Sequence, residues 1–149
     1  MIRSLVVTIF LALVVASTAA ADTRYCFGDG YGNDNDNTCF GHDHTDLAFG
    51  MLKGNDTFYG EGGNDSAHGN ADNDTLFGNK GDDELIGGGG TDYLSGGYGN
   101  DRIDAATGDP WGPRDTIHCG PGFDIVKANA RDFIMNPELC ESITIVPDA

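Results

Sequence analysis

Hydrophobic and polar positions repeat every nine residues through the middle of the chain. In each period a Gly/Asn/Asp-rich stretch ends in an aspartate, and a short run with an apolar middle residue follows, as in Asp74-Thr75-Leu76-Phe77. Neighbouring side chains of a strand point to opposite faces, so the middle residue of a three-residue strand points inward alone. The predicted inward column is Phe58, Ala67, Leu76, Leu85, Leu94, Ile103, Ile117 and Val126.

The aspartates that end the glycine-rich stretches keep the same period. Those spaced by nine are Asp56, Asp65, Asp74, Asp83, Asp92 and Asp101, and after a five-residue insertion near 106–113 the phase resumes with Asp115 and Asp124. A fixed period of this kind is typical of stacked repeats, in which each repeat packs on its neighbours. If each period is half a coil, residues eighteen apart stack and the aspartates form two rows on opposite edges.

Four pairs of aspartates follow from this stacking, and Asp115 and Asp124 extend the rows by two more. The four pairs are Asp56 with Asp74, Asp74 with Asp92, Asp65 with Asp83, and Asp83 with Asp101. Upstream the pattern decays, because Asp46 lies ten residues before Asp56 instead of nine.

The composition limits both the core and the partners. The chain has 149 residues, of which 39% are hydrophobic, with many of these in the first twenty positions, so the remainder is too poor in apolar residues for an ordinary two-layer core. It carries 24 Asp+Glu against 8 Lys+Arg, a net charge of -16. This charge disfavours nucleic acid and anionic lipid as partners and favours small cations.

Two nonapeptides match a known calcium-binding pattern at every fixed position. Gly87 to Ser95 and Gly96 to Asp104 read G-G-x-G-x-D-x-U-x, so the sequence resembles the RTX (hemolysin-type) calcium-binding repeat over about Gly41 to Lys127. The resemblance implies an all-β fold, a parallel β-roll (right-handed β-solenoid) of nonapeptide half-turns. The expected calcium ligands are glycine-loop carbonyls and Asp56, Asp65, Asp74, Asp83, Asp92, Asp101, Asp115 and Asp124. About four sites are expected, or six with the extended rows.

Calcium binding and folding are expected to be one event. Stacked carboxylates repel each other, and the small core does not offset the entropy cost of ordering the coils. Calcium takes six to eight oxygen ligands and would draw carboxylates and loop carbonyls of successive coils together, whereas magnesium is expected to substitute poorly. Glycine suits the loops because their carbonyls must turn at backbone angles that a Cβ disfavours.

The ends of the chain suggest export and disulfide closure. Residues 1–21 have the positive start, apolar stretch and small residues of a secretory signal. We expect an N-terminal cap at 22–40, the β-roll at 41–127 and a C-terminal cap at 128–149. Four cysteines allow three pairings, of which Cys26 with Cys39 and Cys119 with Cys140 is the local choice. It would give the solenoid disulfide-closed ends.

The sequence lacks a recognisable catalytic motif, so no enzymatic activity is expected. The leading hypothesis is a secreted, extracellular calcium-binding protein with a structural or binding role, without nucleic-acid binding and without membrane insertion of the mature chain. The alternative is an adhesin-like module that binds a glycan or protein partner through an exposed face with Thr57, Tyr59, Phe77 and Tyr93. A hydrolase is a remote third hypothesis.

Overall fold

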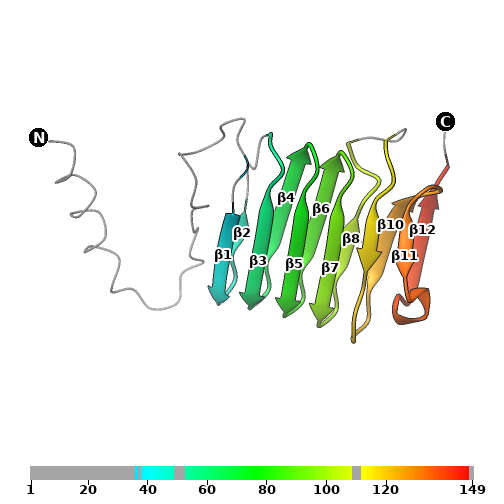
Figure 1. The fold of residues 1–149 in the computed structure, drawn as a ribbon. Coiled ribbons are helices and arrows are strands. Elements are labelled where there is room, and N and C mark those ends of the chain that lie inside the picture. Colours follow the sequence, from blue (N-terminus) through cyan, green and yellow to red (C-terminus); the bar gives the residue numbers. More distant parts are fainter. Residues whose placement is uncertain (1–35, 37, 49–52, 109–111, 148–149) are drawn as a thin grey trace, which may run out of the picture.

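The computed structural model describes residues 36, 38–48, 53–108 and 112–147. They form a β-solenoid of about six coils with parallel strands and almost no helix, which confirms the fold class predicted from the repeat (Figure 1). The predicted signal sequence and most of the predicted N-terminal cap lie outside these residues. Within the described ranges, no helix is both long and apolar enough to span a membrane.

Two six-stranded sheets face each other because successive repeats alternate between them. The first contains, in spatial order, β1 (Thr38–Asp43), β3 (Thr57–Gly62), β5 (Thr75–Lys80), β7 (Tyr93–Tyr98), β9 (Thr116–His118) and β11 (Phe133–Met135). The second contains β2 (Leu47–Ala48), β4 (Ser66–Ala71), β6 (Glu84–Gly89), β8 (Arg102–Asp104), β10 (Ile125–Asn129) and β12 (Ser142–Val146). A short 3₁₀ helix, η1 (Pro137–Leu139), connects β11 to β12.

The register confirms that residues eighteen apart stack. Thr57 pairs with Thr75, and Thr75 with Tyr93. Tyr93 then pairs with Thr116, 23 residues later, because the insertion adds five residues to the eighteen of a regular coil. The period therefore resumes in the structure where it resumes in the sequence.

The predicted inward column forms the core. Its eight side chains are between 0% and 2% exposed, and Ala105, Cys119 and Ala128 extend it. The strands β3 to β7 are six residues long, however, and not three as predicted. The strand continues past Gly60 although Glu61 has a left-handed φ of 69°, and Glu61 and Gly62 pair with the preceding coil.

The C-terminal residues add a further coil to the solenoid. Strands β11 and β12 pair in parallel with β9 and β10. The predicted disulfide between Cys119 and Cys140 is confirmed, with 5.6 Å between the Cα atoms. Cys39 is also disulfide-bonded, and its predicted partner Cys26 lies outside the described residues.

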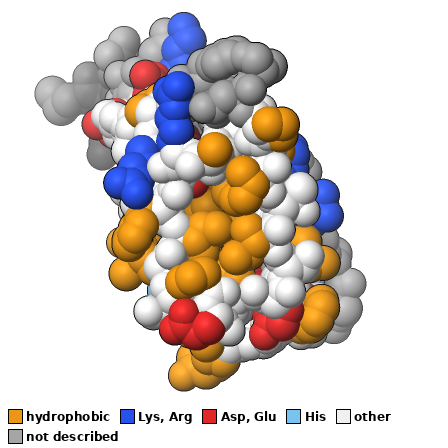
Figure 2. Space-filling model, turned by 90° about the vertical axis from the view of Figure 1, so that its right-hand side faces the viewer, with side chains coloured by type: hydrophobic (Ala, Val, Ile, Leu, Met, Phe, Trp, Pro, Cys, Tyr) orange, Lys and Arg blue, Asp and Glu red, His pale blue; other side chains and the backbone are white. Residues whose placement is uncertain are grey.

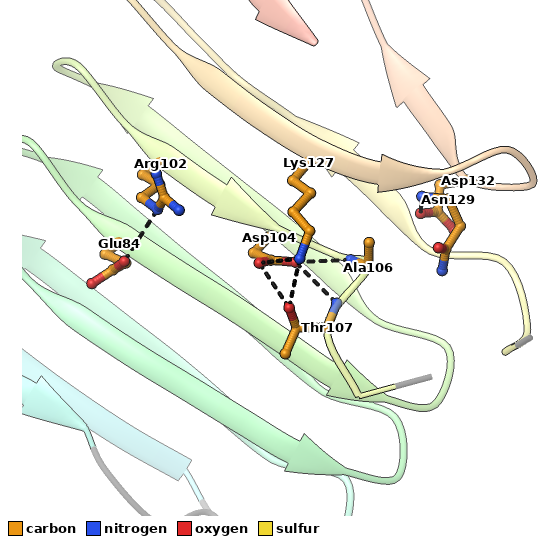
Figure 3. A network of polar contacts seen from close by, with 8 residues as sticks. All are labelled: Glu84, Arg102, Asp104, Ala106, Thr107, Lys127, Asn129 and Asp132. Carbon is orange, nitrogen blue, oxygen red and sulfur yellow. Dashed lines mark hydrogen bonds and ion pairs between the residues drawn. The ribbon is translucent and has the colours of Figure 1, made fainter. Parts of the chain in front are cut away.

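Asp104 anchors the start of the insertion to the last coils (Figure 3). Its carboxylate accepts hydrogen bonds from the backbone N–H groups of Ala106 and Thr107 at 3.0 and 2.9 Å, from the Thr107 hydroxyl at 2.8 Å, and from Lys127 Nζ at 3.0 Å. Burial alone would raise its pKa, but the hydrogen bonds from Lys127 and Thr107 outweigh burial and hold the pKa of Asp104 below its ordinary value. Asp104 is thus a buried carboxylate that the protein itself satisfies.

Candidate metal centre

The repeat aspartates form two continuous rows, one along each edge of the solenoid. The backbone N–H of Asp74 donates to Oδ1 of Asp92 at 2.9 Å, and the N–H of Asp83 donates in the same way to Asp101. The same bond links Asp56 to Asp74, Asp65 to Asp83, Asp92 to Asp115 and Asp101 to Asp124, each at 2.8 Å. The structure therefore brings all eight sequence-predicted residues into the two rows and makes neighbours of all six proposed pairs.

The carboxylates of the rows lie inside the solenoid and not on its surface. All eight aspartates are between 0% and 3% exposed. A buried ionised carboxylate is costly unless hydrogen bonds or a cation compensate the loss of water. The bond from a backbone N–H to Oδ1 provides part of that compensation, since it occupies one oxygen of each row carboxylate from Asp65 to Asp124.

In six of the row carboxylates the second oxygen lacks such a bond. Buried Oδ2 atoms without a hydrogen-bond partner occur in Asp65, Asp74, Asp83, Asp92, Asp101 and Asp124. None of the ion pairs seen among the described residues includes these six carboxylates, whereas Asp104 has Lys127. Orphaned, buried anionic oxygens of this kind require an explanation, and a bound cation is one.

Burial raises the pKa values of these row carboxylates. The pKa rises from the ordinary value of 3.8 to about 7 for Asp65 and Asp101, to about 8 for Asp74 and to about 6 for Asp83. Loss of water is the largest cause, the backbone hydrogen bond opposes it, and a neighbouring aspartate adds repulsion. The pKa values of Asp92 and Asp124 are raised by the same loss of water.

These shifts predict the pH dependence of the metal-free chain. A carboxyl group whose pKa is higher in the folded state than in the unfolded state destabilises the fold as pH rises from about 4 through about 6 to 8. We expect circular dichroism in EDTA to show more β structure at pH 5 than at pH 8.5. An increase of β structure with pH in EDTA would contradict burial of uncompensated carboxylates.

The first glycine of each repeat leaves room for the carboxylate. A Cβ added to Gly69 would collide with Oδ2 of Asp74 and would lie 2.6 Å from the carbonyl oxygen of Gly87, in the next coil. Gly78 has the same relation to Asp83 and to the Gly96 carbonyl, at 2.7 Å. A carboxylate oxygen and a backbone carbonyl oxygen thus converge where a side chain would otherwise be. The sequence predicted glycine for backbone freedom, but at these positions the reason is the close approach of the carboxylate.

Other repeat glycines do provide backbone freedom. Gly88 and Gly90 have φ values of 109° and 136°, which L-residues rarely adopt. Glu61 and Asp72 replace glycines of the repeat, yet they adopt left-handed φ values of 69° and 74°. The early turns therefore keep a left-handed backbone at these positions despite their departures from the pattern.

The structure adds three carboxylates that sequence reasoning missed. The N–H of Asp46, a buried residue, donates to Oδ1 of Asp65, and the rows end where Asp115 donates to Asp132 and Asp124 to Glu141. These partners are 19, 17 and 17 residues apart, so a search at a spacing of eighteen passes over them. Allowing one residue more or less per coil would have found all three.

A second, exposed row of side chains lies beside each buried row. Oδ1 of Asn55 accepts the N–H of Asn73 at 3.1 Å, and Oδ1 of Asn73 accepts the N–H of Thr91 at 2.7 Å. On the other edge, Asn64 accepts from Asp82, and Asp82 from Asn100. These bonds run from the later coil to the earlier one, opposite to the buried rows, so each turn is linked to its neighbour in both directions.

Aromatic side chains line the outer surface of the first sheet. The rings of Phe40 and Tyr59 are stacked with centroids 5.2 Å apart, and those of Tyr59 and Phe77 with centroids 5.1 Å apart. Tyr93 continues the row with a tilted ring 5.6 Å from Phe77. Stacked rings cover each other's faces, so this row packs against itself across the strands. Partner binding by this face stays a prediction.

The donor atoms fit a hard cation. Calcium prefers carboxylate and carbonyl oxygens, which are the groups that converge beside the repeat glycines. Among the described residues, no group of three or more His, Cys, Asp or Glu side chains is placed to hold a metal ion. The carboxylates instead come in pairs along the rows.

The fold and the two rows of buried aspartates together define a repeat solenoid whose turns carry aspartates that pair from coil to coil. Residues 52–85 and 77–110 match the family model of the RTX calcium-binding nonapeptide repeat, in four copies. This part of the chain is therefore built of RTX repeats, and the repeat family together with the fold implies calcium binding. No curated protein and no solved structure matches the chain significantly.

Proposed function

We propose that this chain is a secreted calcium-binding protein whose solenoid folds around calcium held by the repeat aspartates, and that it has a structural or binding role outside the cell without catalysis. The observation that carries the proposal is the set of six buried row carboxylates whose Oδ2 atoms lack a hydrogen-bond partner. The RTX repeat family supports calcium as the ion.

Consecutive aspartates of a row, together with glycine carbonyls, would hold each ion. The residues proposed as ligands are Asp56, Asp65, Asp74, Asp83, Asp92, Asp101, Asp115 and Asp124. Carbonyls such as those of Gly87 and Gly96 would complete the oxygen shell. When bound, calcium supplies positive charge to carboxylates that otherwise repel each other, and the backbone N–H groups keep those carboxylates oriented.

Calcium would stabilise the fold, and its concentration would determine where the chain folds. Ions that bind the folded state and not the unfolded state stabilise the fold by mass action. Extracellular calcium modules commonly bind with dissociation constants of about 10⁻⁴ to 10⁻³ M. With such affinities the solenoid would form after export, where calcium is abundant. The predicted signal sequence supports this route.

Counting the bound ions tests the proposed sites directly. Six aspartate pairs are neighbours in the rows, so we expect about six calcium ions per chain in native mass spectrometry or equilibrium dialysis. The double variant Asp74→Ala, Asp83→Ala removes one member from four of these pairs and should bind about four ions fewer. Binding of fewer than two ions by the unmodified chain would overturn the proposed sites.

A further inference from the structure

The C-terminal end of the solenoid leaves its core uncovered. The inward column continues into the last coil, where Ile143 pairs with Val126 and Ile145 with Ala128. Val126 and Ala128 are 0% exposed, but Ile143 is 36% and Ile145 48% exposed. Figure 2 looks onto this end and shows hydrophobic side chains gathered at its centre. A solenoid end of this kind requires a cover.

The backbone of the same end also lacks a partner strand. Strands β11 and β12 are the last strands of their sheets, and within the described ranges each pairs with one neighbour, β9 and β10. An open edge with exposed apolar residues is a template for another strand. A further strand could therefore pair with either sheet at this end.

We infer that a second copy of this chain covers this end, with the two copies related by a two-fold axis perpendicular to the sheets. Such an axis passes between the two β12 strands at the level of Thr144. It makes β12 antiparallel to β12 of the second copy. Ile143 of one copy then faces Ile145 of the other, and Ser142 faces Val146. Directly opposite residues of antiparallel strands share a face, so the inward column of one copy continues into that of the other. The exposed isoleucines of one copy are thus covered by the same isoleucines of the other copy, as in a symmetric dimer interface.

The charges at the two edges of this end fit the same symmetry. Arg131 lies in the turn between β10 and β11, whereas Glu138 and Glu141 lie in the connection between β11 and β12, on the opposite edge. Figure 2 shows acidic side chains at the lower rim of this end, and basic side chains at its upper left, with acidic ones beside them, and at its right. The two-fold axis exchanges the two edges, so the Arg131 edge of each copy meets the acidic edge of the other. Complementary charge at the rim of an apolar patch is typical of a specific interface.

The mass of the folded chain in calcium tests this interface. At about 0.1 mM chain, sedimentation equilibrium should give the mass of two chains. Ile145→Glu should reduce it to the mass of one chain. Ile125→Glu is the matched control, because Ile125 is 41% exposed and lies on the outer face of β10, and it should keep the mass of two chains. Circular dichroism establishes that each variant is folded.

A charge exchange provides an independent test that leaves the isoleucines intact. Arg131→Glu alone should weaken the association at least tenfold, and combining it with Glu138→Arg should restore it. A one-chain mass for the unmodified protein would overturn the inference, as would a two-chain mass for folded Ile145→Glu. A mass that increases beyond two chains with concentration would also overturn it, because head-to-tail stacking does not close.

Discussion

Replacing Asp83 with alanine is expected to lower the free energy of unfolding in calcium by about 3 kcal/mol or more, a large fraction of the total for a small domain. Asp83 lies in the middle of its row and is shared by two proposed sites, with Asp65 and with Asp101. Its loss also leaves the buried N–H of Asp65 without an acceptor. Urea unfolding in saturating calcium measures the effect.

The neighbouring Asp82 provides the matched control. Its exposed carboxylate accepts two hydrogen bonds, both from Asn100 at the surface, so Asp82→Ala should cost less than about 1 kcal/mol. Asp83→Asn separates the two roles of Asp83, because an amide oxygen still accepts the N–H of Asp65 but carries no charge. We expect Asp83→Asn to weaken calcium binding and to stabilise the metal-free chain. Equal losses for Asp82→Ala and Asp83→Ala would contradict the proposed sites.

Replacing Gly78 with alanine is the second change with a large expected effect. The added Cβ would collide with Oδ2 of Asp83 and would lie 2.7 Å from the carbonyl oxygen of Gly96. Neither group can move away easily, since Asp83 is held by the row and Gly96 belongs to the next coil. We expect a loss of about 1–3 kcal/mol or more in the free energy of unfolding, together with weaker calcium binding.

Gly62 is a glycine of the same sheet that should tolerate alanine. A Cβ at Gly62 would have its nearest contact at 3.5 Å, with Oδ1 of Asp43, an ordinary van der Waals distance. Because its φ lies outside the left-handed region, Gly62→Ala should change the free energy of unfolding by less than about 1 kcal/mol. Calcium binding should stay the same. If both alanine variants behave alike, the convergence of oxygens at Gly78 has no energetic importance.

The regular part of the solenoid was predictable because one period determines the core residues, the aspartate rows and the strand register together. A spacing of nine places Leu76 and Leu94 in the core, and it aligns Asp74 with Asp92 in a row. A slip of one residue would turn every side chain to the opposite face, so the register is strongly determined. The insertion did not obscure this, since it ends before Asp115 and leaves the following period intact.

The irregular coils were not predictable from the period. Asp46, Asp132 and Glu141 enter the rows at spacings of 19 or 17, where a turn has gained or lost a residue. Pairing of β11 and β12 with the preceding coil depends on stacking and not on a local pattern. The bonds between Asp104, Thr107 and Lys127 join the two sides of the insertion, which have no common period.

A far-UV circular dichroism titration of the chain without its predicted signal sequence, first with calcium and then with magnesium, tests directly whether calcium drives folding. We expect a disordered spectrum in EDTA at neutral pH and a cooperative gain of β structure at about 10⁻⁴ to 10⁻³ M calcium. Magnesium at the same concentration should produce little change, because it is smaller and requires an octahedral shell. Equal β content in EDTA and in calcium would contradict the central claim that calcium holds this solenoid together.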